Sequence, residues 1–157
     1  MNSYLWSTVL PEVLKTSLDP GLVRGVISVE SGWDTWATRY EKKYRWLWPG
    51  YNQVVAPAGV SHDTEVMQQM TSWGLMQVMG AVAREMGFRE RFISRLCNPI
   101  VGVRYGCKYL EHMKEKRGWD GEDLISAYNA GRPTKDNADY VRKVMKNYEG
   151  SNWETTA

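Results

Sequence analysis

The sequence predicts a single, mostly α-helical domain. Three observations carry this prediction: a length of 157 residues, apolar residues that recur at helical spacing along most of the chain, and capping residues at the ends of those stretches. A chain of this length buries roughly two-thirds of its unfolded surface around one core, so residues 1–157 need no second domain. No stretch alternates clearly enough to predict a sheet, although residues 46–60 leave room for a small hairpin.

The expected helices begin and end at residues with a known preference for those positions. Asp19 and Asn98 each stand before a proline, which suits the first turn of a helix, and Gly32 and Gly118 are placed to end the helices that follow. Residues 150–157 are expected to be loose. The expected helices are, in order, residues 4–18, 20–31, 63–70, 80–86, 98–117, 120–130 and 137–148.

Residues 33–61 have no clear period and are rich in aromatic side chains. Breakers at Pro49, Gly50, Pro57 and Gly59 argue against regular structure here. A loop of this length in a small domain is usually a binding loop or a lid, and so many rings argue against disorder. Two interpretations stay open: the rings pack on one another, or at least one of them contacts a sugar.

Composition excludes several classes of function. A net charge of +2 is too small to indicate nucleic-acid binding, although it suits approach to an anionic cell wall or membrane surface. Cys97 and Cys107 lie ten residues apart, about 15 Å along a helix, so we expect free thiols and synthesis in a reducing compartment. His62 and His112 belong to no ligand set of known spacing, and we expect no metal and no cofactor.

The N-terminal residues and the hydropathy pattern bear on location. Residues 1–20 have no basic segment and no small-residue cleavage site, so we expect no secretory signal. No apolar run approaches 18 residues, so we expect no stable insertion into a membrane.

Glu30 is the main candidate for chemistry. On a helix it shares one face with Val23, Val26 and Ile27, which directs the carboxyl toward the protein interior. Apolar surroundings and the negative end of the helix dipole both raise the pKa of a carboxyl, as a general acid near neutral pH requires. The alternative is a glutamate that points to solvent from the last helical turn.

Three short segments stand in order along the chain. They are Glu30-Ser31, residues 74–77 (Gly-Leu-Met-Gln) and residues 127–131 (Ala-Tyr-Asn-Ala-Gly). Each is weak alone, but as an ordered set they resemble the soluble lytic transglycosylases of family 1, whose fold is related to goose-type lysozyme. The resemblance covers about residues 19–148, and Tyr140-Val141 is similar to a later tyrosine motif of that family. It implies a lysozyme-like fold of the α+β superfamily.

The resemblance also implies a reaction and its residues. Glu30 is similar to the single acid/base that cleaves the bond between N-acetylmuramic acid and N-acetylglucosamine and closes a 1,6-anhydro ring. Tyr128 is similar to the residue that hydrogen-bonds and orients this acid. Gln77 offers a donor and an acceptor to an acetamido group, and methionine side chains adapt to the face of a sugar. The substrate-binding residues implied are Ser31, Met76, Gln77, Met79, Asn129 and Tyr140.

One departure from the family pattern is large. Between Ser31 and Gly74 lie 42 residues, where the family has a short connection, so residues of about 33–72 form an insertion beside the expected cleft. Gly80 also stands where many relatives have proline. The insertion resembles that of small phage endolysins, in which a Trp-Gly-Leu-Met-Gln segment follows. The resemblance therefore implies a monomeric endolysin made in the host cytoplasm, released through a holin, and acting on peptidoglycan in the periplasm.

Two other functions stay open at this point. A hydrolytic lysozyme needs a second carboxylate to activate water, and the candidates are Asp34, Glu41, Asp63 and Glu65. A protein of another class would bind or assemble peptidoglycan without cleaving it, which the intact Glu30 argues against.

Overall fold

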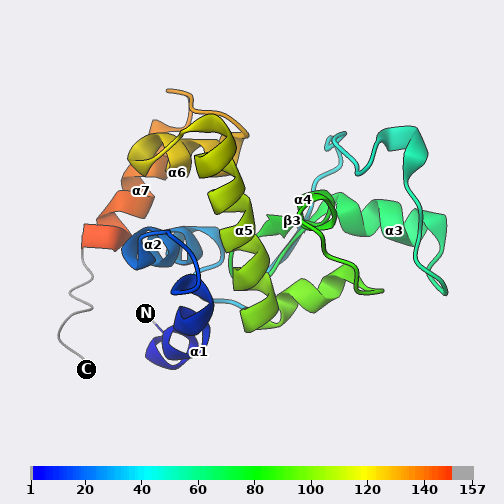
Figure 1. Cartoon of the computed structure of the whole chain (residues 1–157), viewed down its shortest axis with the longest axis horizontal. Helices are drawn as coiled ribbons and strands as arrows, with labels where there is room; N and C mark the ends of the chain where they lie inside the picture. Colours follow the sequence, from blue (N-terminus) through cyan, green and yellow to red (C-terminus); the bar gives the residue numbers. More distant parts are fainter. Residues whose placement is uncertain (1, 150–157) are drawn as a thin grey trace.

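The computed structural model describes residues 2–149 as a mostly helical domain with one small sheet (Figure 1). This confirms the predicted fold class. The expectation for residues 150–157 lies outside the described part of the chain. The elements are α1 Ser3–Val13, α2 Pro20–Glu30, β1 Thr38–Tyr40, the 3₁₀ turn η1 Tyr51–Gln53, α3 His62–Gln69, β2 Thr71–Trp73, β3 Val78–Met79, α4 Gly80–Glu85, the 3₁₀ turn η2 Ile93–Cys97, α5 Pro99–Arg117, α6 Gly121–Ala130 and α7 Ala138–Glu149.

The predicted caps form as expected. The Asp19 carboxylate accepts hydrogen bonds from the backbone N–H of Gly21 at 2.7 Å and of Leu22 at 3.4 Å, so α2 begins at Pro20. The Asn98 side chain caps α5 in the same way. The first helix is shorter than predicted and ends at Val13. The Thr16 hydroxyl donates a hydrogen bond to the Val13 carbonyl at 2.6 Å, and the chain turns there.

The sheet lies where the sequence analysis placed none. Its three strands pair antiparallel in the order β1-β2-β3, with Arg39 opposite Ser72 and Ser72 opposite Met79. Strands of two or three residues are too short to display an alternating pattern, which explains why they were missed. The hairpin considered for residues 46–60 is wrong, because that segment holds only η1 and irregular backbone.

Helix α5 runs through the middle of the molecule (Figure 1). Helices α1, α2, α6 and α7 lie on one side of it, and the sheet, α3 and α4 lie on the other. Apolar side chains from both sides close into one buried core around α5, which supports a single domain. Fully buried members of this core include Val26, Ile27, Leu75, Val103, Leu110, Leu124 and Val144.

Helices α2 and α7 approach closely because α2 has a glycine at the contact. A Cβ built on Gly25 would lie 2.7 Å from the backbone oxygen of Val144, nearer than real Cβ atoms come. The two backbones could not lie at this distance with a larger residue at position 25. This packing holds the C-terminal end of α2 against α7, where the candidate acid stands.

A buried ion pair joins the inserted segment to the rest of the domain. The Arg84 guanidinium of α4 donates to both carboxylate oxygens of Glu65 in α3, at 2.8 and 2.9 Å, and both side chains are buried. The Gln69 amide donates to the same carboxylate and also bonds the backbone N–H and C=O of Trp48. The inserted segment is therefore fastened at Trp48 through a continuous polar network.

Two further expectations concern cysteines and membranes. Cys97 and Cys107 are free and buried, as predicted from their spacing, and burial raises the pKa of the Cys107 thiol to about 12. Within residues 2–149 no helix combines the length and the apolar character that a membrane crossing requires.

Candidate active site

Glu30 is the last residue of α2 and is half-buried. Val23, Val26 and Ile27, which share its helix face, are fully buried, as the sequence predicted. Burial raises the pKa of Glu30 above the ordinary value of 4.5, while a hydrogen bond from Tyr140 and the positive charge of Arg39 pull the pKa back down. The pKa of Glu30 is therefore set by opposing effects, of which burial is the largest.

The phenol that holds this carboxyl is Tyr140 of α7. Its hydroxyl donates to Oε1 of Glu30 at 2.5 Å, across 110 residues of sequence. The packing of α2 on α7 brings the two side chains together. Burial and the Glu30 charge both raise the pKa of Tyr140, so the phenol stays neutral and keeps its proton for this bond.

The predicted hydrogen bond from Tyr128 to Glu30 is wrong. The Tyr128 hydroxyl donates instead to the backbone oxygen of Met76 at 2.7 Å, which joins α6 to the 74–77 segment. Burial, followed by the charge of Glu30, raises the pKa of Tyr128 well above the ordinary tyrosine value. Tyr128 thus borders the site as a neutral, half-buried group, and Tyr140 makes the hydrogen bond to Glu30 that was expected of Tyr128.

The side-chain amide of Gln77 bonds other residues of the protein, whereas the sequence predicted that it would face a sugar. Its amide nitrogen donates to the backbone oxygens of Ala37 at 2.8 Å and of Gly74 at 3.0 Å, and its amide oxygen accepts from the Ser72 hydroxyl at 2.9 Å. Both amide hydrogens are used inside the protein, so the amide cannot offer a donor to an acetamido group. Gln77 holds the end of the segment before β1 against the turn between β2 and β3.

The two methionines of the site differ in exposure. Met76 is fully buried, and a Cβ built on Gly106 of α5 would collide with its sulfur. Its predicted role as a wall of a sugar subsite is wrong, because a side chain without exposed surface cannot touch a ligand. Met79 is half-buried at the end of β3, so contact with sugar stays a prediction for that residue.

Ser31 and Asn129 both make internal hydrogen bonds. The Ser31 hydroxyl donates to the backbone oxygen of Leu75 at 2.8 Å and accepts from the backbone N–H of Trp33, which ties the end of α2 to the 74–77 segment. The Asn129 oxygen accepts from the Asn137 amide at 3.1 Å and so steadies the turn between α6 and α7. A substrate contact by either residue stays a prediction.

Arg39 is the residue of this region that the sequence analysis missed. It lies in β1, it is the charge that lowers the pKa of Glu30, and its guanidinium donates to Glu41. No sequence signal marked it, because its position depends on the undetected sheet. The structure therefore adds a cation to the surroundings of the acid.

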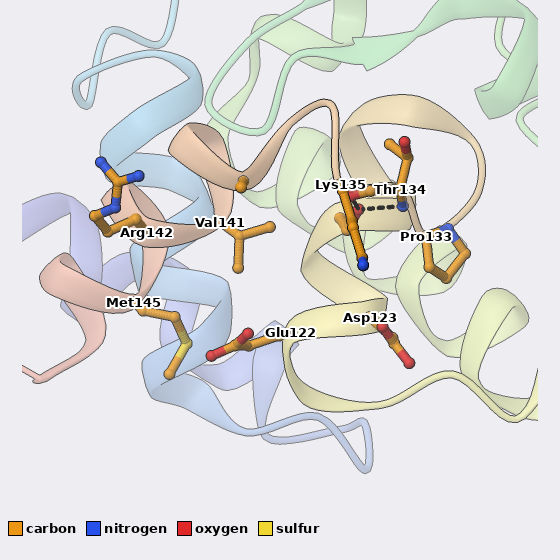
Figure 2. A pocket seen from close by; sticks show the side chains of 10 residues that line it. Glu122, Asp123, Pro133, Thr134, Lys135, Val141, Arg142 and Met145 are labelled. Atoms are coloured by element: carbon orange, nitrogen blue, oxygen red, sulfur yellow. Dashed lines mark hydrogen bonds between the residues drawn. The ribbon is translucent and has the colours of Figure 1, made fainter.

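A surface hollow of about 580 Å³ lies between α6 and α7 (Figure 2). Glu30 is not among the residues that line it, so this hollow is separate from the candidate acid. In residues 2–149 no cluster of three or more His, Cys, Asp or Glu side chains is placed to hold a metal. The hollow is lined by Glu122, Asp123, Ser126, Pro133, Thr134, Lys135, Ala138, Val141, Arg142 and Met145.

Comparison with known proteins gives the family. The model of the transglycosylase SLT domain matches residues 11–150, which is most of the chain and includes Glu30, the 74–77 segment, Tyr128 and Tyr140. No solved structure matches the chain. The half-buried acid held by a tyrosine lies inside the matched region. The chain belongs to the family of transglycosylase SLT domains, which have lytic transglycosylase activity on peptidoglycan.

Proposed function

We propose that this protein cleaves the β-1,4 bond between N-acetylmuramic acid and N-acetylglucosamine in peptidoglycan and leaves 1,6-anhydro ends. Glu30 is the single acid/base of the reaction. The observation that carries this proposal is the 2.5 Å hydrogen bond from Tyr140 to a half-buried Glu30 whose pKa is raised by burial. A carboxyl in this state holds a proton at a pH where an exposed glutamate has lost it.

The reaction uses Glu30 twice. In the first step the protonated carboxyl donates its proton to the glycosidic oxygen, and the bond from that oxygen to C1 of the muramic acid breaks. In the second step the carboxylate takes the proton of the C6 hydroxyl of the same sugar, and that oxygen bonds to C1. The first proton leaves on the oxygen of the released sugar, the C6 hydroxyl returns a proton to Glu30, and water takes no part.

Tyr140 suits both steps. Its hydrogen bond fixes the carboxyl in one orientation, which lowers the entropic cost of reaching the reactive geometry. The same bond lowers the pKa of Glu30, and so stabilises the carboxylate that exists between the two steps. A neutral phenol achieves this without a second charge beside the acid.

Three of the four carboxylates named for hydrolysis are already engaged, which favours this mechanism, whereas the fourth, Asp63, is exposed in the first turn of α3. Glu65 is buried in its ion pair with Arg84, Glu41 accepts from Arg39, and Asp34 accepts from the backbone N–H of Trp36. A hydrolase needs a second carboxylate that is available to activate water. Glu65 has no exposed surface and so cannot serve as that base.

The biological setting that we propose is host lysis by a monomeric phage endolysin. The support is the long 33–72 insertion before a Trp-Gly-Leu-Met-Gln segment. Expression of the chain in a bacterial host with and without a holin tests this setting. We expect rapid lysis only when the two are made together, and light scattering of the purified protein at the mass of one chain, 18.1 kDa.

The test of the catalytic proposal replaces Glu30 with glutamine. Glu30→Gln is nearly isosteric and can still accept from Tyr140, but it cannot donate a proton to the leaving oxygen. We expect loss of wall lysis with retained binding to insoluble peptidoglycan. The matched control is Glu115→Gln, the same change at an exposed position of α5, which should lyse the wall normally. Undiminished lysis by Glu30→Gln would remove Glu30 from the mechanism.

A further inference from the structure

Residues 41–51 of the inserted segment form a loop with the sequence EKKYRWLWPGY, which we name the basic aromatic loop. It lies toward the α3 end of the molecule, away from α2 and α7 (Figure 1). The loop holds three cations and one carboxylate, so its net charge of +2 equals that of the whole chain. The positive charge of the protein is therefore unevenly distributed.

The cations of the loop are available for an external partner. Lys42, Lys43 and Arg45 are exposed, and none of them forms an ion pair with another residue in the described range 2–149. The carboxylate of the loop, Glu41, is already occupied by the Arg39 guanidinium. The loop thus presents three uncompensated positive charges to solvent.

Aromatic rings project from the same loop. Trp46 is 76% exposed and Tyr51 is 65% exposed, whereas Leu47 between them is buried. Exposed indole and phenol rings beside lysine and arginine are typical of proteins that bind the interface of a bilayer. A ring that serves as a platform for sugar has protein behind one face, whereas most of the Trp46 surface is exposed and its contact with the Tyr44 ring, at 5.6 Å between centroids, is an edge contact.

The loop is held in place from inside the protein. Trp48 is clamped by the Gln69 amide through both its backbone N–H and its C=O, and the Arg89 guanidinium lies 4.8 Å from the centre of its ring. Gln69 is in turn fixed by the buried Glu65. This anchoring means that Lys42, Lys43, Arg45 and Trp46 project from a fixed support, so little ordering is needed when a partner binds.

We propose that the basic aromatic loop binds the surface of an anionic phospholipid bilayer. The three cations contact lipid phosphates, and Trp46 and Tyr51 enter the headgroup layer. The association is peripheral and reversible, because one loop provides too little apolar area for permanent anchoring. It does not depend on the reaction at Glu30.

Sedimentation with vesicles tests the role of charge. We expect the full chain to bind vesicles of phosphatidylcholine and phosphatidylglycerol, to ignore vesicles of phosphatidylcholine alone, and to be released by salt. Lys42→Gln/Lys43→Gln should weaken binding roughly thirtyfold, from about 1 kcal/mol for each charge near the surface. The matched control Lys143→Gln/Lys146→Gln removes two exposed lysines from α7 and should bind as the unaltered chain does. Equal losses in both variants would contradict the proposal.

A second measurement tests the ring. Trp46→Ser should bind the anionic vesicles more weakly and should lose the quenching of tryptophan fluorescence by brominated lipid. Tyr4→Ser, which removes a ring of the same exposure, 76%, from α1, should change neither property. Quenching that persists in Trp46→Ser would show that this ring does not enter the bilayer.

Lysis of purified wall separates a bilayer from a glycan as the partner. No lipid is present in that assay, so Lys42→Gln/Lys43→Gln and Trp46→Ser should digest the wall at the normal rate, which also shows that they fold. If wall digestion and wall binding fall in these variants while vesicles bind no form of the protein, the loop is a glycan site and the proposal is overturned.

Discussion

At the scale of single residues, two tyrosines near Glu30 have different hydrogen-bond partners. Tyr140 donates to the carboxyl, and Tyr128 donates to the Met76 backbone oxygen. The two phenols lie in the same region but have different partners. Their conservative replacement by phenylalanine therefore gives different expected results.

Tyr140→Phe removes a hydrogen bond that lowers the pKa of Glu30. The pKa should rise further, so the alkaline limb of the activity profile, where Glu30 loses its proton, should move to higher pH. Maximal turnover should fall roughly tenfold because the carboxyl is no longer oriented. The pH dependence of wall lysis by the purified variant checks both effects.

Tyr128→Phe is the comparison for that measurement. It should lower stability by about 1 kcal/mol, since the buried Met76 carbonyl loses its donor, and should leave the alkaline limb where it is. A shift of the limb in Tyr128→Phe, with none in Tyr140→Phe, would reverse the assignment of the two tyrosines.

The raised pKa of Glu30 also affects folding stability. Because the folded state binds this proton more tightly than the unfolded chain, stability falls as pH rises from the ordinary value of 4.5 through the folded pKa. Glu30→Gln removes that loss, so it should melt a few degrees above the unaltered chain at neutral pH. Thermal unfolding should show the advantage vanish below the ordinary glutamate pKa, and a variant that is less stable at neutral pH would contradict burial of the acid.

At the scale of elements, the Glu65–Arg84 pair fastens α3 to α4. Arg84→Met leaves a buried carboxylate without its partner and should cost about 3–5 kcal/mol in chemical denaturation. Glu65→Leu/Arg84→Met removes both charges and should recover part of that loss, since the groups left unpaired, the carbonyl partners of Arg84 and one amide hydrogen of Gln69, are neutral. A single variant as stable as the unaltered chain would mean that the pair does not hold the insertion.

The helices could be predicted from the sequence because their signals are local. Asp19 and Asn98 cap the helices that follow within three residues, and the apolar periods of α2 and α5 lie within single segments. The sheet could not be predicted, because strands of two or three residues have no period and β1 pairs with β2 across about 30 residues that include α3. The directions of the Gln77 amide and the Tyr128 hydroxyl follow from that sheet and turn, so their partners were missed for the same reason.

At the scale of the whole molecule, the packing of α2 on α7 connects fold and function. The sequence pattern of its own helix was enough to identify Glu30 as a candidate. Its partner Tyr140 could not be identified in the same way, because the contact depends on the close approach of α2 to α7 at Gly25. The inserted segment then lies on the other side of α5, with its own polar network and an exposed basic loop (Figure 1). The loop begins at Glu41, which is bonded to the Arg39 that lowers the pKa of Glu30, and continues away from α2 and α7 toward α3 (Figure 1).

The central claim is that one acid, without an activated water, cleaves the glycan. Mass spectrometry of the ends released from purified peptidoglycan tests it most directly. The account predicts 1,6-anhydro-muramyl ends throughout the digest, and none when Glu30→Gln replaces the unaltered chain. Hydrated reducing ends in place of anhydro ends would contradict the claim and would assign the protein a hydrolytic mechanism with a second catalytic group.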